Sequence, residues 1–167
     1  LSGGISQLAK VRNVETLQGL ASFVSNQELL VKEKDKEVKV QFKDCIIASG
    51  SSASLIPGLP KNNKSILTSK TALDLESVPE NFLVVGGGII GLELGQVYAA
   101  LGSKVTVVEF LPNLVPGADP DLMKPLHRKL KKQFELILLS SKVTKVSSFD
   151  ENKLKVKIES EVETIEK

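Results

Sequence analysis

The stretch Phe82-Leu83-Val84-Val85-Gly86-Gly87-Gly88-Ile89-Ile90-Gly91-Leu92-Glu93 is an apolar run that breaks into glycines and continues with helix-forming residues. Residues 83–85 have the β-branched, apolar character of a buried parallel strand. Downstream, apolar residues recur at helical spacing and predict a helix face that packs on a sheet: Ile90, Leu94, Val97, Tyr98 and Leu101. The order of strand, glycine turn and helix is typical of a dinucleotide-binding turn.

A second apolar strand is predicted at residues 104–108, and it stops on the acid Glu109. Glu109 follows Gly91 by about the interval of roughly 20 residues expected between a glycine fingerprint and the acid that binds the adenosine ribose. A carboxylate there accepts hydrogen bonds from ribose hydroxyls and repels a 2′-phosphate. The pattern therefore predicts NAD in preference to NADP. A glycine turn with no ligand is the alternative, and it leaves the position of Glu109 unexplained.

Each glycine of the turn has a predicted task. Gly86 allows the tight turn, Gly88 lets a pyrophosphate approach the backbone, and Gly91 lets the helix lie close to the strand. The N-terminus of the helix then offers free N–H donors to the phosphates.

Composition excludes several classes of protein. Of 167 residues, 41% are hydrophobic and 25% charged, as in ordinary globular proteins, and a net charge of +2 gives no broad footprint for nucleic acid. No apolar run approaches the roughly 20 residues that span a bilayer. A single cysteine excludes an internal disulfide framework and favours a reducing compartment such as the cytoplasm. We expect no metal site, and the start at Leu1 suggests an internal piece of a longer protein.

The segments on either side define the expected organisation. Before the glycine turn we expect the end of a helix at 1–13, a short strand at 14–17 that enters a turn at Gly19, strands at 28–33 and 37–42, and a buried strand at 45–48. After it we expect a helix from Asp119-Pro120 with a buried stripe of Leu122, Leu126, Leu130 and Phe134, a parallel strand at 136–139, and a hairpin of 143–149 with 154–158. The bases of that helix are interpreted as a solvated face: Lys124, Arg128, Lys129, Lys131 and Lys132. The expected domains are 1–52, a linker at 53–78, and an incomplete domain at 79–167.

These motifs resemble the pyridine nucleotide-disulfide oxidoreductases over essentially the whole chain. The resemblance rests on the glycine turn continued through Leu94-Gly95, on Val107-Val108-Glu109, and on Ile46-Ile47-Ala48-Ser49-Gly50-Ser51. Within that family the similarity is greatest to the bacterial dihydrolipoamide dehydrogenases, flavoenzymes that oxidise dihydrolipoamide with NAD as acceptor. It implies an α/β fold: a Rossmann-like NAD-binding domain, a parallel sheet with an added β-hairpin, preceded by the β-rich end of an FAD-binding domain.

The resemblance also implies site residues. The NAD pyrophosphate would be wrapped by Gly86, Gly87, Gly88, Ile89, Ile90, Gly91, Leu92 and Glu93, with the Glu93 carboxylate near the nicotinamide. Glu109 would hold the adenosine ribose, and Val143 would meet the adenine through its backbone. FAD would be contacted by Ala21, Ser49, Gly50 and Ser51, although the family more often has Gly at the first of these positions and Thr at the second.

Other parts that the family uses are not in this sequence: an FAD glycine fingerprint, a closely spaced cysteine pair and a His–Glu base. We therefore expect no catalytic residue here, and no activity from this piece alone. Cys45 is interpreted as a buried, inert thiol and His127 as a surface histidine. The resemblance implies a homodimeric parent that serves a lipoamide-bearing 2-oxo acid dehydrogenase complex, with no nucleic acid or membrane as partner. The alternatives are another FAD/NAD(P) disulfide reductase and a non-catalytic NAD-binding module.

Overall fold

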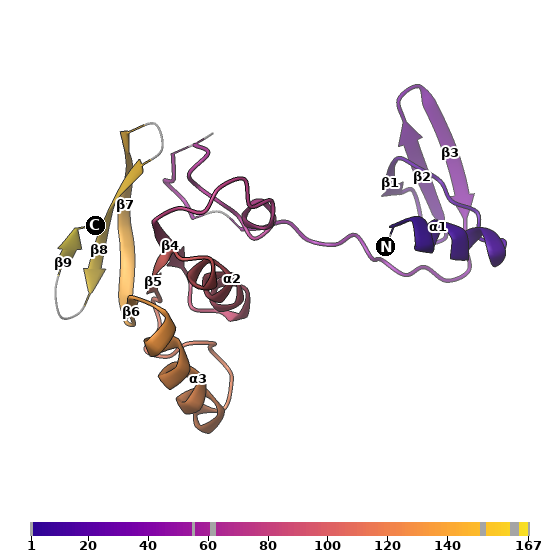
Figure 1. Cartoon of the computed structure of the whole chain (residues 1–167). Coiled ribbons are helices and arrows are strands. Elements are labelled where there is room, and N and C mark those ends of the chain that lie inside the picture. Colours follow the sequence, from indigo (N-terminus) through magenta and orange to yellow (C-terminus); the bar gives the residue numbers. More distant parts are fainter. Residues whose placement is uncertain (1, 55, 61–62, 151–152, 161–163, 167) are drawn as a thin grey trace. The chain divides into compact units, whose positions relative to one another are not determined.

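The computed structural model describes residues 2–54, 56–60, 63–150, 153–160 and 164–166, and Figure 1 traces them along the chain. The chain divides into two compact units, Leu1–Ser51 and Ser52–Lys167. Among the described residues, no helix is both long and apolar enough to span a membrane.

The first unit is a helix with a small antiparallel sheet. It contains α1 (Ser2–Val11), β1 (Leu20–Phe23), β2 (Glu28–Glu33) and β3 (Lys36–Gln41), with the strand order β1-β2-β3. The predicted helix end and the two predicted strands of the hairpin are confirmed, with boundaries shifted by up to two residues. Of the hydrophobic residues described in this unit, only Val31 is buried, so the unit has little core of its own.

Two strand predictions in this unit are wrong. The strand expected at 14–17 begins instead at Leu20, directly after Gly19, whose φ is +142°. A Cβ on Gly19 would lie 2.5 Å from the Lys32 carbonyl oxygen, so glycine is what lets the chain come alongside β2. Residues 45–48 form no strand, and Ile46 is 93% exposed, because no strand of the described residues pairs with them. Cys45 is accordingly exposed, and its interpretation as a buried thiol is wrong.

The second unit is built on the predicted parallel sheet. The strands β4 (Asn81–Val85), β5 (Lys104–Val108) and β6 (Leu136–Leu138) lie in the order β4-β5-β6. The helix α2 (Ile89–Ala100) connects the first pair and α3 (Pro120–Gln133) the second, as the sequence predicts. A short 3-10 turn, η1 (Thr71–Leu73), precedes the sheet, and its buried Ala72 accepts a hydrogen bond at its carbonyl oxygen from the Tyr98 hydroxyl, at 2.8 Å.

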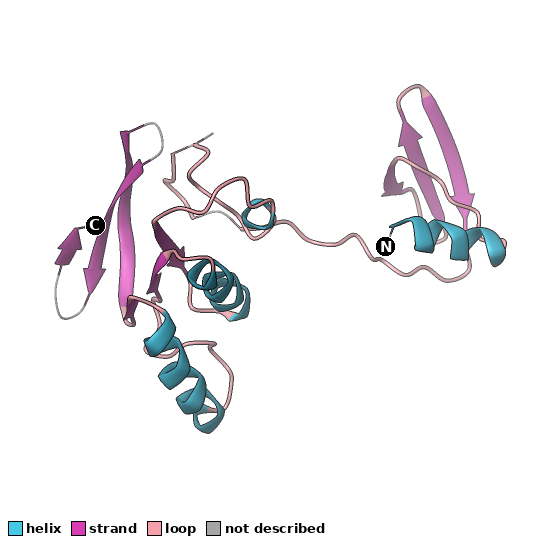
Figure 2. Cartoon of the chain, viewed as in Figure 1, coloured by secondary structure: helices cyan, strands magenta, loops and turns pink. Residues whose placement is uncertain are grey.

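The two faces of this sheet carry different layers, because side chains alternate along each strand. Val84, Val105 and Val107 pack in one cluster with residues of α2 and α3. Val108 packs on the other face with Val156 and Ile158. That second layer is the antiparallel sheet of β7 (Ser141–Asp150), β8 (Lys153–Ser160) and β9 (Thr164–Glu166), seen beside β5 and β6 in Figure 2. The β7–β8 hairpin is confirmed as predicted from the sequence, whereas β9 was not predicted. Part of the predicted turn at 150–153 lies outside the described residues.

The buried helix faces differ from those predicted. In α2 the prediction is confirmed for Tyr98, which is buried, and for Leu94, which packs on the core, but it is wrong for Ile90, Val97 and Leu101, which are exposed. The other buried residues of α2 are Leu92 and Gly95. The face with glycines packs closely on β5 and on the end of α3: a Cβ on Gly95 would lie 3.5 Å from Val105 Cγ1 and 3.1 Å from Phe134 Cζ.

In α3 the N-cap is as predicted, since the Asp119 carboxylate accepts from the Asp121 N–H at 2.9 Å. The predicted stripe is wrong at Leu122, which is 71% exposed, and Met123 packs on the core in its place. A spacing of four residues drifts around a helix of 3.6 residues per turn, and over eight residues from Leu130 the drift carries Leu122 off the buried face. The five bases of α3 are exposed, as expected for a solvated face.

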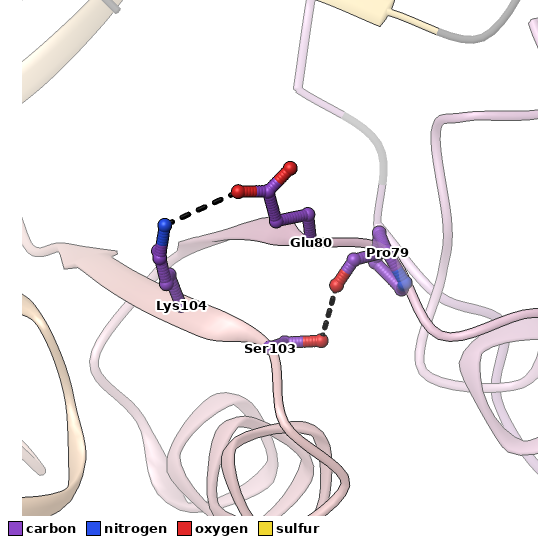
Figure 3. Close-up of polar contacts among 4 residues, drawn as sticks. All are labelled: Pro79, Glu80, Ser103 and Lys104. Atoms are coloured by element: carbon purple, nitrogen blue, oxygen red, sulfur yellow. Dashed lines mark hydrogen bonds and ion pairs between the residues drawn. The ribbon is translucent and has the colours of Figure 1, made fainter.

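The amino ends of β4 and β5 are tied together, as Figure 3 shows. The buried Ser103 hydroxyl donates to the Pro79 carbonyl oxygen at 2.6 Å, and the Lys104 N–H donates to the Glu80 carbonyl oxygen at 2.7 Å. An exposed ion pair joins Lys104 Nζ to Glu80 Oε1 at 3.1 Å. These contacts fix the register of the parallel pair, whose carboxyl ends then meet at the opposite edge of the sheet.

Candidate functional site

The glycine turn joins the carboxyl end of β4 to the N-terminus of α2. Gly86 has φ +109°, which a side chain would strain, and its N–H donates to the Val108 carbonyl oxygen at 2.8 Å. Gly88 is the N-cap of α2, and the first hydrogen bond of the helix runs from the Leu92 N–H to the Gly88 carbonyl oxygen. No side chain caps this end, so the N–H groups of the first turn remain available to an anion.

Space around the turn is divided between packed and open positions. A Cβ on Gly91 would collide with the Gly86 carbonyl oxygen and lie 3.0 Å from Val84 Cγ1, so helix and strand are in contact there. A Cβ on Gly88 would meet nothing within 4 Å. The open position is the one at which the sequence predicts the approach of a pyrophosphate, and the geometry fits such a group.

The Glu109 carboxylate is fixed by main-chain donors. Glu109 is only 7% exposed; its Oε2 accepts from the Gly87 N–H at 2.6 Å and its Oε1 from the Leu111 N–H at 2.8 Å. Hydrogen bonds to a charged acceptor are among the stronger ones in proteins, and a carboxylate has about four lone-pair sites. Glu109 therefore joins the glycine turn to the end of β5 and keeps capacity for further donors such as hydroxyls.

A pocket of about 470 Å³ lies at this edge of the sheet. The start of β7 is held beside it by a hydrogen bond from the Ser141 N–H to the Glu109 carbonyl oxygen, at 2.9 Å. The residues that line the pocket are mostly apolar: Ile56, Val85, Gly86, Val108, Glu109, Phe110, Ser141, Lys142 and Val143. An apolar pocket with one carboxylate suits the adenosine half of a dinucleotide.

Three residues predicted for the nucleotide, Gly86, Glu109 and Val143, thus line one pocket, and Gly87 is bonded to Glu109. Sequence reasoning missed Phe110 and Lys142, although each is the chain neighbour of a predicted residue. It also missed Ile56, which lies in the segment interpreted as a linker and carries no sequence signal.

The other predicted residues lie elsewhere. Glu93 is exposed on α2 and does not line this pocket. Ala21 is exposed in β1, opposite Val31 of β2, and residues 49–51 are exposed without secondary structure. Among the described residues, no strand pairing links Ala21 to residues 49–51.

His127 is partly exposed, and so less exposed than the predicted surface histidine. Its Nε2 is buried and has no hydrogen-bond partner among the described residues. Burial and then the charge of Lys131 lower the pKa of His127. The described residues contain no cluster of three His, Cys, Asp or Glu side chains that could hold a metal.

Comparison with known proteins covers nearly the whole chain. Residues 2–166 match the family described as pyridine nucleotide-disulphide oxidoreductase. A dihydrolipoyl dehydrogenase from Vibrio parahaemolyticus is 42% identical over 89% of this chain and 31% of its own length. One from Buchnera aphidicola is 41% identical over 96% of this chain and 34% of its own length. The chain thus spans about a third of the length of these relatives.

Solved structures share the fold. LpdA from Mycobacterium tuberculosis superimposes with a TM-score of 0.85 at 21% identity, covering 99% of this chain and 37% of its own. The HOCl-induced flavoprotein disulfide reductase RclA from Escherichia coli gives a TM-score of 0.80 at 25% identity, with the same coverage of each chain.

Proposed function

Because the chain belongs to the pyridine nucleotide-disulphide oxidoreductase family, we propose that it is the nucleotide-binding segment of a dihydrolipoyl dehydrogenase. Such an enzyme oxidises dihydrolipoamide and passes the electrons through FAD to NAD. The relatives from Vibrio parahaemolyticus and Buchnera aphidicola, both more than 40% identical, carry that name, which supports this member over others of the family. The sequence has a single cysteine and so lacks a redox pair, and we propose that this segment alone is inactive.

The observation that carries the proposal is the fixed Glu109 carboxylate in a mostly apolar pocket. With its two oxygens already oriented by the Gly87 and Leu111 N–H groups, Glu109 would accept hydrogen bonds from the adenosine ribose hydroxyls. Its charge would repel the 2′-phosphate of NADP. Val143, in the same pocket, would contact the adenine through its backbone.

The remaining nucleotide contacts follow from the turn. The open face at Gly88 and the uncapped N-terminus of α2 would hold the pyrophosphate, because the N–H donors and the helix dipole both favour negative charge. The predicted set is Gly86, Gly87, Gly88, Ile89, Ile90, Gly91, Leu92 and Glu93, with the exposed Glu93 carboxylate placed near the nicotinamide. When bound, NAD supplies the hydride acceptor of the reaction; this chain supplies binding and orientation.

We propose the domain division 1–52, 53–78 and 79–167, with the first part belonging to an FAD-binding domain. The separation of the chain into units at Ser51 and Ser52 supports its first boundary. Ala72 packs in the core of the second unit, so the end of the connecting segment docks on the NAD-binding domain. FAD contacts are proposed at Ala21, Ser49, Gly50 and Ser51.

The wider setting is also a proposal. The parent protein would be a cytoplasmic homodimer that oxidises the dihydrolipoamide of a 2-oxo acid dehydrogenase complex back to lipoamide. The names of the relatives support the reaction, and the near-neutral charge of the chain is in keeping with a partner other than nucleic acid.

Glu109→Ala tests the proposal in the FAD-loaded protein that contains this chain. We expect NADH affinity to fall by roughly ten- to a hundredfold, because charge-assisted bonds of about 1.5–3 kcal/mol are lost, and discrimination against NADPH to lessen. Titration of NADH fluorescence measures both. Glu76→Ala, an exposed acid outside the pocket, is the matched control and should bind NADH as the wild type does.

The activity assay separates the candidate functions. Dihydrolipoamide-dependent reduction of NAD by the wild type would support the proposed enzyme. NADH oxidation with another disulfide substrate, and none with lipoamide, would favour a different disulfide reductase, which the fold shared with RclA also permits. NAD binding without bound FAD would favour a non-catalytic nucleotide-binding module.

A further inference from the structure

Gly87 is held at both of its main-chain polar groups. Its N–H donates to Glu109 Oε2 at 2.6 Å, and its carbonyl oxygen accepts from the Val115 N–H at 2.9 Å. The second contact comes from the loop between β5 and α3, which sequence reasoning treated only as an irregular connection. With both groups bonded, the two peptide planes that flank Gly87 have fixed orientations, and these planes lead directly into Gly86 and Gly88.

Leu114 packs against the same glycine. It is 4% exposed and belongs to the core cluster between the sheet and its helices. A Cβ added to Gly87 would lie 2.6 Å from Leu114 Cδ2, so the side chain occupies the space that any other residue at Gly87 would need. Leu114 therefore closes one side of the turn by direct contact with its backbone.

Val115 makes its hydrogen bond from a strained backbone. Its φ is +47°, in the left-handed region that β-branched residues very rarely adopt. Such strain persists only where the surroundings over-determine it, and it is concentrated at functional sites. Here the unusual conformation coincides with an N–H that is directed at the Gly87 carbonyl oxygen.

We propose that Leu114 and Val115 are positioning residues of the nucleotide site: they hold Gly87, and through it the glycine turn, in the conformation that receives the pyrophosphate. This inference rests on the NAD binding proposed above. Neither residue lines the adenosine pocket, and both contact Gly87, so the proposed action is through Gly87 rather than by contact with the adenosine.

The test compares two leucines of one core in the FAD-loaded protein that contains this chain. Leu114→Ala removes the contact with Gly87, whereas Leu130→Ala removes a fully buried leucine of the same cluster from α3. Both should lower the melting temperature, but only Leu114→Ala should weaken NADH binding, by tenfold or more. Equal NADH affinity in the two variants would overturn the proposal, while a wild type that fails to bind NADH would overturn the proposed function instead.

A second measurement keeps the test decisive if Leu114→Ala folds poorly. Leu114→Val shortens the side chain less and should give an intermediate loss of affinity. In addition, Gly87→Ala should cost less affinity, by at least threefold, in the Leu114→Val background than in the wild type. The shorter side chain relieves the closest contact of the new Cβ, 2.6 Å from Leu114 Cδ2, while its contacts with Glu109 are the same in both backgrounds. Independent effects of the two substitutions would show that Leu114 does not act through Gly87.

Discussion

At the scale of single residues, the glycines of the turn have two different roles: Gly91 stabilises the fold, and Gly88 leaves space for the proposed ligand. Gly91 lies where helix and strand touch, so the Cβ of Gly91→Ala would press on the Gly86 carbonyl oxygen and on Val84. Overpacking against backbone costs about 1–3 kcal/mol, more than the roughly 1 kcal/mol that alanine gains over glycine inside a helix. We expect a melting temperature lowered by several degrees, measured by thermal unfolding followed with circular dichroism.

Gly88→Ala is the matched variant, because a Cβ there meets no protein atom within 4 Å and its φ of −75° suits alanine. Its unfolding free energy should fall by no more than about 1 kcal/mol, the typical cost of alanine at an N-cap. Its NADH affinity should nevertheless fall, because the methyl group enters the space proposed for the pyrophosphate. Equal losses of stability in Gly91→Ala and Gly88→Ala would contradict the assignment of Gly91 to the fold and of Gly88 to the ligand.

At the scale of elements, two side-chain contacts anchor the amino ends of the parallel pair β4 and β5 (Figure 3). One is the buried Ser103 hydrogen bond and the other is the exposed Lys104–Glu80 ion pair. Ser103→Ala removes the buried hydroxyl and leaves the Pro79 carbonyl oxygen without its 2.6 Å donor. We expect a loss of about 1–2 kcal/mol in unfolding free energy by urea titration. Glu80→Gln removes only the exposed ion pair with Lys104 and should cost less than about 0.5 kcal/mol. The reverse order of costs would mean that the ion pair sets the register.

Sequence patterns predicted elements well where one rule acted alone. The strands β4, β5 and β6 follow from apolar runs, and α3 begins where its capping residues indicate. The predictions failed where glycine residues determine which helix face packs, and where a strand needs a partner strand to form. The face of α2 that packs on the sheet contains Gly91 and Gly95, which carry no hydrophobic signal, and residues 45–48 lack a partner among the described strands. The interval between the glycine turn and the next acid similarly predicted Glu109 as a site residue. The positioning role proposed for Leu114 could not be predicted in this way, because it depends on a loop that only the folded structure brings to Gly87.

At the scale of the whole molecule, the two units differ in how much apolar surface they bury. Among the described residues of the first unit, Val31 is the one hydrophobic residue that is buried. Both hydrophobic core clusters lie in the second unit. Side chains such as Ile46 and Leu20 remain exposed in the first unit. Each fully buried aliphatic side chain contributes about 1.5–3 kcal/mol, so opening the first unit should cost much less than opening the second.

Hydrogen exchange measured by mass spectrometry on this 167-residue chain tests that difference. Amides of β2, the central strand of the first sheet, should exchange at least about a hundredfold faster than those of β5, the central strand of the parallel sheet, because a difference of about 3 kcal/mol in opening free energy corresponds to that ratio. Both strands are paired on two sides, so hydrogen-bond number alone predicts equal protection. Equal rates would therefore show that strand pairing, rather than apolar burial, sets the local stability of this chain.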